Sequence, residues 1–219
     1  MTDAHVAVAH DYHGLSVLRR ALGVTFEDAE ITARRDVRSV LPSPSRSGDP
    51  VDLAPVETVH ATAWLDWGDR LGTYEFDDVQ YRSWVRSPTL LVRGVRGELR
   101  DEVVRHVGAE GQPLRSTLER VAAGGAGSHE GMFLRGYTLD GQWPYRNAFR
   151  PARLPDDELS IARLVADMAD HVLQGAPPPY SVAEAAQDQY LQLEVRRAAA
   201  SGERVRTSPQ PWADGRTCE

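Results

Sequence analysis

The sequence predicts an α+β fold: an open, largely antiparallel β-sheet with helices packed on one face. Two observations predict it. Several strand-like segments follow one another between residues 56 and 139 without a long helix between them, so neighbouring strands are expected to reverse direction. Helix-like segments lie near the two ends of the chain, where they can pack on a sheet built from the middle.

The first helix is predicted over residues 11–22, because Leu15, Leu18 and Leu22 recur with the spacing of one helix face. Gly23 follows them as a residue suited to end a helix. Residues 38–55 are rich in proline, serine and glycine, a composition typical of a surface loop or arm.

The strands are predicted from alternating apolar side chains and from turns. Residues 56–67 alternate, and the face opposite the apolar one still carries Trp64. Because this outer face of the sheet is not purely polar, we expect the same sheet of a second subunit to cover it, which makes a homo-oligomer. Further strands are expected at residues 71–76, 90–93, 98–107 and 131–139, the last closed by a hairpin turn at 140–141.

Two helices are predicted to close the fold. The first begins at the acidic residues 156–158, and Gly175 with the prolines after it ends this helix. Ser181 and Glu184 form a capping-box pattern that begins the last helix, expected to run to Ala200. Residues 1–206 are then expected to form a single domain, followed by a tail over residues 207–219.

Composition narrows the class of function. The formal net charge of −7 argues against a nucleic-acid partner, which needs a clustered basic face. No apolar run approaches the roughly 20 residues of a membrane span, and the N-terminus lacks the features of a signal peptide. The lone cysteine, Cys218, is expected to be a free thiol in a reducing compartment, which predicts a cytoplasmic protein. The expected partner is a small-molecule substrate. All 25 basic residues are arginine, so any titrating lysine must come from another chain.

Several segments together resemble the C-terminal, substrate-binding domain of the Gfo/Idh/MocA family of NAD(P)-dependent oxidoreductases. They occur in the family's order along nearly the whole chain: residues 9–23, 80–83 with 90–98, 136–141, 156–168 with 180–191, and 211–212. The resemblance implies hydride transfer between NAD(P) and a sugar-like or polyol substrate.

In that family a dinucleotide-binding Rossmann domain comes first, whereas only eight residues precede the stretch that begins at Ala9. We therefore expect the NAD(P) site to lie in a separately encoded subunit or upstream in a longer chain. The glycine cluster at residues 124–127 follows the helix-like residues 114–123 and precedes a strand, which is the reverse of a dinucleotide-binding turn. This chain alone is expected to bind no cofactor, and it is not expected to act as an NAD-dependent dehydrogenase by itself.

The candidate catalytic residues lie at the start of the first helix. The resemblance implies an Asp and a His in the pattern D-x-x-x-H beside the nicotinamide ring; His13 matches the histidine, while Ala9 stands at the aspartate position. Imidazole exchanges protons near neutral pH, so His13 is the first candidate for proton transfer with a substrate hydroxyl, with His10 and Asp11 as weaker ones. The alternative is a half-buried histidine without a catalytic role. The scattered remaining histidines complete no metal-ligand set, and no metal is expected.

A second group of residues suits the lining of a sugar or polyol pocket, through aromatic faces and polar groups that form paired hydrogen bonds. These candidates are Tyr12, Tyr81, Arg93, Tyr137, Trp143, Tyr145 and Asn147. The alternative for each of them is packing in the sheet or exposure on the surface.

Two other functions stay open at the level of sequence. One is a cofactor-independent isomerase, dehydratase or epimerase that uses His13 with His10 or Asp11. The other is a non-catalytic binding or assembly module that retains the sheet and has lost the chemistry.

Overall fold

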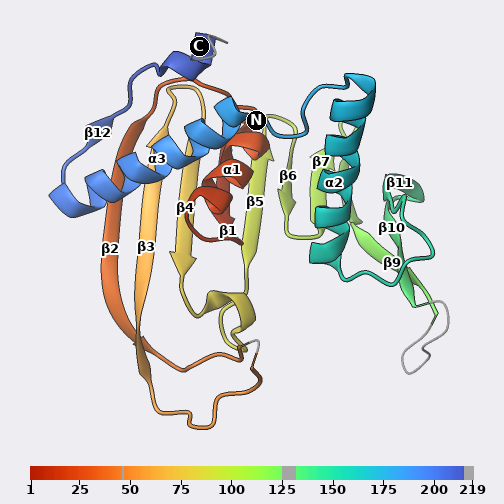
Figure 1. The fold of residues 1–219 in the computed structure, drawn as a ribbon, viewed down its shortest axis with the longest axis horizontal. Helices are drawn as coiled ribbons and strands as arrows, with labels where there is room; N and C mark the ends of the chain where they lie inside the picture. The colour runs from red at the N-terminus through yellow and green to blue at the C-terminus, as the bar shows by residue number, and fades with distance from the viewer. Residues whose placement is uncertain (46, 125–131, 215–219) are drawn as a thin grey trace. The chain divides into compact units, whose positions relative to one another are not determined.

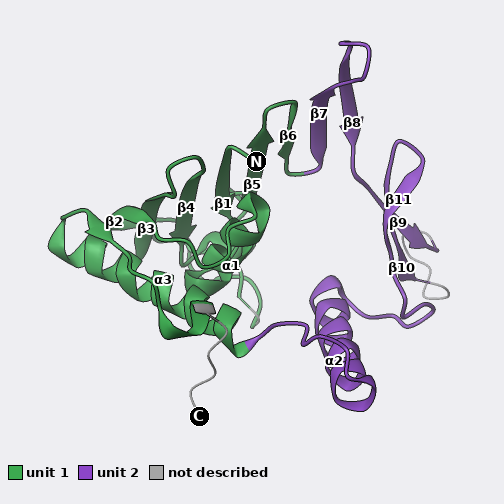
Figure 2. Cartoon of the chain, turned by 90° about the horizontal axis from the view of Figure 1, so that it is seen from above, with its two compact units in different colours: residues 1–101, 182–219 green, residues 102–181 purple. Residues whose placement is uncertain are grey.

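The computed structural model describes residues 1–45, 47–124 and 132–214. These residues form two compact units, one made of residues 1–101 with 182–219 and one made of residues 102–181 (Figure 2). Most of the glycine cluster at residues 124–127 lies outside the described residues, as does the single cysteine, Cys218. None of the helices in the described part of the chain is both long and apolar enough to cross a bilayer.

The sheet of the first unit has the strand order β12-β2-β3-β4-β1-β5-β6 (Figure 1). Its neighbours pair antiparallel except β1 and β4, which run parallel with Val6 opposite Tyr74. The prediction of a largely antiparallel α+β sheet is confirmed. The strands are β1 (Asp3–Ala7), β2 (Glu30–Val40), β3 (Val56–Asp66), β4 (Leu71–Asp77), β5 (Thr89–Gly94), β6 (Gly97–Arg100) and β12 (Val205–Arg206).

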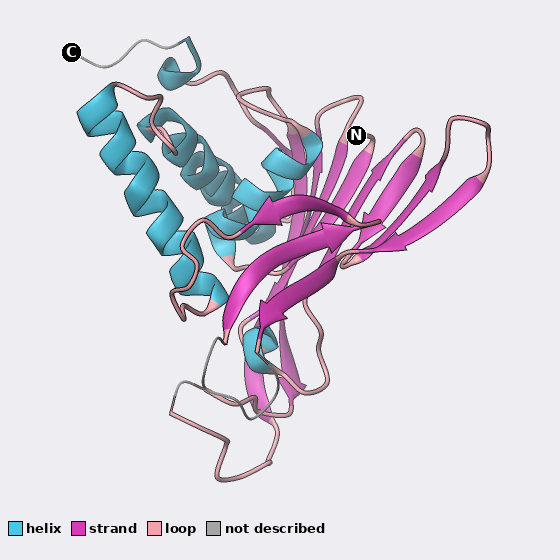
Figure 3. Ribbon diagram, turned by 90° about the vertical axis from the view of Figure 1, so that its right-hand side faces the viewer, coloured by secondary structure: helices cyan, strands magenta, loops and turns pink. Residues whose placement is uncertain are grey.

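Helices α1 (Asp11–Leu22) and α3 (Val182–Ser201) pack on one face of this sheet (Figure 2 and Figure 3). The pleat of the strands sends alternate side chains to that face, so Ile31 pairs with Leu65 across β2 and β3 and both are buried beneath the helices. On the opposite, outer face Trp64 stays 45% exposed and Leu71 43% exposed.

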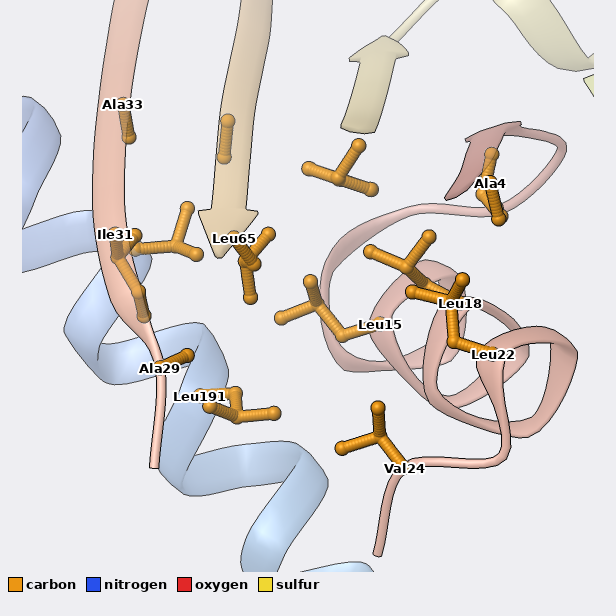
Figure 4. Packing of buried hydrophobic residues seen from close by; sticks show 14 of the residues in the cluster. Ala4, Leu15, Leu18, Leu22, Val24, Ala29, Ile31, Ala33, Leu65 and Leu191 are labelled. Atoms are coloured by element: carbon orange, nitrogen blue, oxygen red, sulfur yellow. The ribbon is translucent and has the colours of Figure 1, made fainter. Parts of the chain in front are cut away.

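The core of the first unit lies between the two helices and the sheet. Leu15, Leu18 and Leu22 of α1 meet Leu65 and Leu191 there, as the helical spacing predicts (Figure 4). Full burial of a leucine side chain contributes about 1.5–3 kcal/mol, so these residues account for much of the attachment of α1. The helix ends where Gly23 adopts the left-handed conformation, with φ of 69°.

The residues that follow Arg206 pack against the body of the first unit. Thr207 is buried, and its hydroxyl accepts a hydrogen bond from the Ala29 backbone N–H at 2.7 Å. A 3₁₀ helix, η2 (Pro211–Asp214), comes next, and Trp212 donates from Nε1 to Gln187 of α3 at 2.9 Å. A second 3₁₀ helix, η1 (Gln80–Arg82), follows β4.

The second unit contains a hairpin of β7 (Val103–Val107) and β8 (Pro113–Thr117), a sheet in the order β11-β10-β9, and helix α2 (Asp156–Gln174). The sheet consists of β9 (Glu119–Ala123), β10 (Phe133–Leu139) and β11 (Gln142–Arg146). Asp140 and Gly141 both have positive φ in the turn between β10 and β11, which confirms the predicted hairpin. Gly175 ends α2 in the left-handed conformation, as predicted.

Three predictions of secondary structure are wrong, two in the bounds of an element and one in its type. Residues 38–40 belong to β2, so the proline-rich loop begins at Leu41. Residues 98–107 form two strands rather than one, because Asp101 takes a φ of 53° and turns the chain between β6 and β7. The helix-like residues 114–123 form β8 and β9, because pairing with neighbouring strands outweighs local helix propensity.

Candidate functional site

A cavity of about 220 Å³ lies in the first unit, between the start of α1, the helix-facing side of β2 to β4 and the second half of α3. Part of its wall is apolar and comes from Val59, Ala61, Phe76, Val195 and Ala199. The rest is polar or charged and comes from His10, Asp11, Arg34, Arg35, Tyr74, Asp78, Tyr81, Gln192 and Arg196. The polar and charged side chains outnumber the apolar ones, so the lining suits a small ligand that is itself polar.

His10 and Tyr81 form the closest polar pair on the cavity wall. His10 precedes α1, and its Nδ1 lies 2.5 Å from the Tyr81 hydroxyl oxygen. The same oxygen accepts the His10 backbone N–H at 3.1 Å. Phe76 contacts both rings, with centroids 5.9 Å from His10 and 5.1 Å from Tyr81. The sequence therefore places an imidazole and a phenol in direct contact where a ligand can reach them.

Asp11 is held from three sides at the first position of α1. Its backbone has a φ of 47°, uncommon for a residue other than glycine, and its N–H donates to the Tyr74 hydroxyl at 2.8 Å. Its Oδ1 accepts Gln192 Nε2 at 2.6 Å and lies 3.3 Å from Arg196 Nη2. Burial raises the pKa of the Tyr74 hydroxyl, so this group stays protonated while it accepts the Asp11 N–H.

Gln192 carries an unsatisfied polar atom in this cavity. The side chain is 4% exposed, and its Nε2 is bound to Asp11. Its Oε1 is buried without a hydrogen-bond partner among the described residues. A buried carbonyl oxygen without a partner is costly, and the hydrogen bond from Nε2 to Asp11 is the one polar interaction of this amide among the described residues.

His13 and Tyr12, the neighbours of these residues, lie on the exposed side of α1. The His13 ring stacks 4.1 Å from Tyr12 and lies 5.0 Å from the His10 ring. Both residues are exposed, and neither is among those that line the cavity. The structure thus places His10 and Asp11, the weaker candidates from sequence, on the cavity wall, and His13 beside it.

Arg93 lies away from the cavity. It is on β5 opposite Asp3, on the outer face of the sheet, whereas its neighbour Val92 faces the core. Its guanidinium is within 3.3 Å of Asp3 and 3.2 Å of Glu98.

The other four candidates belong to the second unit. Asn147 is completely buried, donates from Nδ2 to the Leu134 carbonyl at 2.7 Å and accepts the Phe149 N–H at 2.9 Å, so its amide is committed to local structure. Tyr137 donates to Asp156 at 3.3 Å, and its ring lies 6.2 Å from that of Tyr145. Arg146 stacks 5.2 Å above the ring of Trp143.

Sequence reasoning missed the cavity residues of β2 and α3. Arg35, Gln192 and Arg196 are far apart along the chain and belong to no motif. One local signal was present: Gln192 and Arg196 are four residues apart on one helix and therefore share a face with Val195. That signal is weak without knowledge of what packs beside the helix.

The described residues do not fit a dinucleotide cofactor. Such a site needs a glycine-rich turn between a strand and a helix, so that backbone N–H groups reach the pyrophosphate. The described chain passes from strand to α-helix at residues 8–10 and 147–155, and neither connection contains glycine. Among the described residues there is also no group of three His, Cys, Asp or Glu side chains arranged to hold a metal ion.

Comparison with known proteins gives a likeness of fold. No protein-family model matches the sequence, and no curated protein matches it. An oxidoreductase from Agrobacterium radiobacter, solved in complex with NAD+, L-tartaric acid and magnesium, matches 93% of this chain with a TM-score of 0.51 and 17% identity. An oxidoreductase domain protein from Kribbella flavida matches 93% of this chain with a TM-score of 0.52 and 13% identity. Levoglucosan dehydrogenase, in complex with NADH and L-sorbose, matches 95% with a TM-score of 0.50 and 14% identity.

The chain spans little more than half of these solved structures: 55%, 57% and 58% of their lengths in the same order. They are oxidoreductases of the Gfo/Idh/MocA type, and the coverage is consistent with their C-terminal domain. The resemblance seen in the sequence is thereby confirmed at the level of the fold.

Proposed function

We propose that this chain is the substrate-binding half of a Gfo/Idh/MocA-type oxidoreductase and that its cavity binds a sugar-like or polyol substrate. The NAD(P) site then comes from a separate Rossmann-domain subunit or from a further part of the native chain. The described residues contribute the walls of the substrate site and the groups that hold or move a proton.

The observation that carries this proposal is the mixed lining of the cavity, in which polar and charged side chains lie beside apolar ones. Arg35 and Arg196 offer donors for ligand oxygens, while Phe76 and Val59 offer apolar surface for C–H faces. A molecule with alternating C–H and O–H groups matches this mixture. Two of the solved oxidoreductases of similar fold were crystallised with such molecules, L-tartaric acid and L-sorbose.

Binding of L-sorbose and of L-tartrate to the 219-residue chain, measured by calorimetry and by NMR shift perturbation, tests the proposal. Replacing Gln192→Met keeps the size of the side chain and removes the amide that holds the Asp11 carboxylate on the cavity wall, so affinity should fall about 10- to 100-fold, the cost of one buried hydrogen bond. Gln189→Met, on the exposed side of the same helix, is the matched control and should bind like the wild type. If neither compound perturbs residues of the cavity, the choice of these substrates is wrong.

The proposal also concerns partners. We propose that a second copy of this chain covers the outer face of the sheet, where Trp64 and Leu71 are both exposed by more than two-fifths. Light scattering of the wild type and of Trp64→Glu tests this point, because a charge buried in such an interface should shift a dimer to the monomer. A wild-type monomer would contradict it.

A cofactor-independent isomerase, dehydratase or epimerase is the second candidate function. The observation that favours it is the direct contact between the His10 imidazole and the Tyr81 hydroxyl, which provides acid–base groups without any cofactor. Incubation of L-sorbose with the chain in D2O distinguishes the two: deuterium incorporated at carbon without nicotinamide supports this candidate.

A further inference from the structure

Two groups of His10 meet the Tyr81 hydroxyl. Its oxygen accepts the backbone N–H of His10 at 3.1 Å, and it lies 2.5 Å from Nδ1 of the same residue. A phenol has one proton to donate. If His10 Nδ1 carried a proton, the oxygen would accept twice and the phenolic proton would be left to water, since Tyr81 is 47% exposed. If Tyr81 donates to Nδ1 instead, the phenolic proton is bound within the pair.

This contact favours the neutral tautomer of His10 in which Nδ1 is the acceptor, because the Tyr81 proton is then used within the pair. With Nδ1 accepting from Tyr81, the ring proton lies on Nε2, and Nε2 makes no hydrogen bond to another described residue. His10 lines the cavity, so Nε2–H is the group that this ring can offer to a ligand.

The packing around the pair holds both rings in place. Phe76 contacts the two rings, and His10 is restrained further by the edge of the His13 ring at 5.0 Å. Asp11 anchors the following backbone through Tyr74. Restraint of this kind keeps the Tyr81 to Nδ1 hydrogen bond aligned while a ligand binds.

We propose that His10 and Tyr81 form a proton relay on the wall of the cavity, in which His10 is the proton donor and Tyr81 a positioning residue that replaces its proton. This inference rests on the proposed function for the identity of the ligand, but not for the state of the pair. In the transfer, the His10 Nε2–H bond breaks and an O–H bond forms on a substrate oxyanion. At the same time the Tyr81 O–H bond breaks and an Nδ1–H bond forms.

The charge balances in this step. The negative charge moves from the substrate oxygen to the Tyr81 oxygen, where the His10 backbone N–H remains as a donor at 3.1 Å, and the imidazole stays neutral throughout. The reverse sequence removes a proton from a substrate hydroxyl. No oxidant or reductant is involved in the proton transfer itself, so the relay serves either candidate function.

NMR of the 15N-labelled, ligand-free chain at pH 8 tests the resting state. We expect His10 to be a single Nε2–H tautomer, with a slowly exchanging proton of Tyr81 correlated to Nδ1. Tyr81→Phe should remove that proton signal, and Tyr190→Phe, on α3, should leave it unchanged. A protonated Nδ1 in the wild type, or a labile proton that survives Tyr81→Phe, would overturn the proposal.

Saturating L-tartrate then separates a relay from mere packing. In a relay, an oxyanion at Nε2 moves the Nε2–H and the Tyr81 proton signals together, and in Tyr81→Phe the Nε2–H signal moves alone. A wild-type Nε2–H that shifts while the Tyr81 proton does not would make the contact structural and refute the relay. If L-tartrate moves neither signal, that counts against the proposed ligand class, and the ligand-free spectrum still decides whether Tyr81 donates to Nδ1, the state that the relay requires.

Discussion

Arg19 and Asp188 form a buried ion pair that joins α1 to α3. Their side chains are 6% and 0% exposed, and Arg19 Nη1 donates to Asp188 Oδ1. Arg19 also donates from Nε to the Thr25 carbonyl at 3.0 Å, and its guanidinium lies 5.8 Å from the centre of the Phe26 ring. Because α1 and α3 each contribute a wall of the cavity, this pair fixes the distance between the two halves of the site.

Removing one charge of this pair should destabilise the first unit strongly. Asp188→Ala leaves the Arg19 guanidinium buried without its counter-ion, and we expect a loss of about 3–5 kcal/mol in the free energy of unfolding, measured by urea denaturation. The surface pair Arg163–Asp167, whose side chains are 63% and 27% exposed, provides the control, since Asp167→Ala should cost less than about 1 kcal/mol. The double variant Arg19→Met/Asp188→Leu should recover most of the loss. An Asp188→Ala variant as stable as the control would show that the pair does not hold the helices.

Gly14 should resist substitution although alanine favours a helix. A Cβ at this position would lie 2.5 Å from the Ala9 carbonyl oxygen and 2.5 Å from Cε2 of Tyr74. Alanine gains about 1 kcal/mol in helix propensity, but overpacking costs about 1–3 kcal/mol. We expect Gly14→Ala to lower stability by up to about 2 kcal/mol and to weaken L-sorbose binding, because Tyr74 and its bond to Asp11 must move. Ser16→Ala, two residues on, should be neutral or slightly stabilising in the same assays.

The sequence predicted the elements whose signals are local. Helix α1 was predicted to its last residue because the leucine spacing and Gly23 lie within a dozen residues of each other. The hairpin between β10 and β11 was predicted because Asp140 and Gly141 are themselves the turn. Strand β1 was missed because five residues of mixed polarity give no periodic signal, and its pairing with β4 and β5 depends on distant segments.

Only some of the residues that line the cavity could be predicted, because the others depend on contacts between distant segments. His10, Asp11 and Tyr81 stood out as residue types with useful chemistry, but their partners come from α3, whose packed side mixes apolar residues such as Leu191 with the polar Gln192. A buried polar residue on a helix is stable because of what it meets, here Asp11. The sequence around Gln192 does not indicate this partner, so only the structure shows that Gln192 holds Asp11.

A buried histidine on the outer face of the sheet should make stability depend on pH. His60 is 3% exposed on β3; its Nε2 lies 3.1 Å from the Thr62 hydroxyl and 3.3 Å from Glu75 Oε1. Burial lowers its pKa below the ordinary 6.5, and the charge of Arg38 on β2 lowers it further. The carboxylates of Glu75 and Asp77 on β4 raise the pKa of His60, whereas the charge of Arg86 lowers it. Asp36 of β2 lies opposite His60 in the strand register.

The sign of the effect follows from the lowered pKa. Well above pH 6.5 neither the folded nor the unfolded chain protonates this imidazole, and its contribution to stability is complete. As the pH falls below 6.5, the imidazole binds a proton in the unfolded chain but not in the folded chain. The free energy of unfolding therefore decreases until the pH passes below the pKa of His60 in the folded state. His60→Gln should remove this part of the pH dependence between pH 7.5 and pH 5, measured by urea denaturation with tryptophan fluorescence. His13→Gln, at an exposed position of α1, should leave the slope as in the wild type. Equal slopes in the His60→Gln variant and the wild type would mean that the imidazolium is tolerated, with Glu75 and Asp77 compensating for its burial.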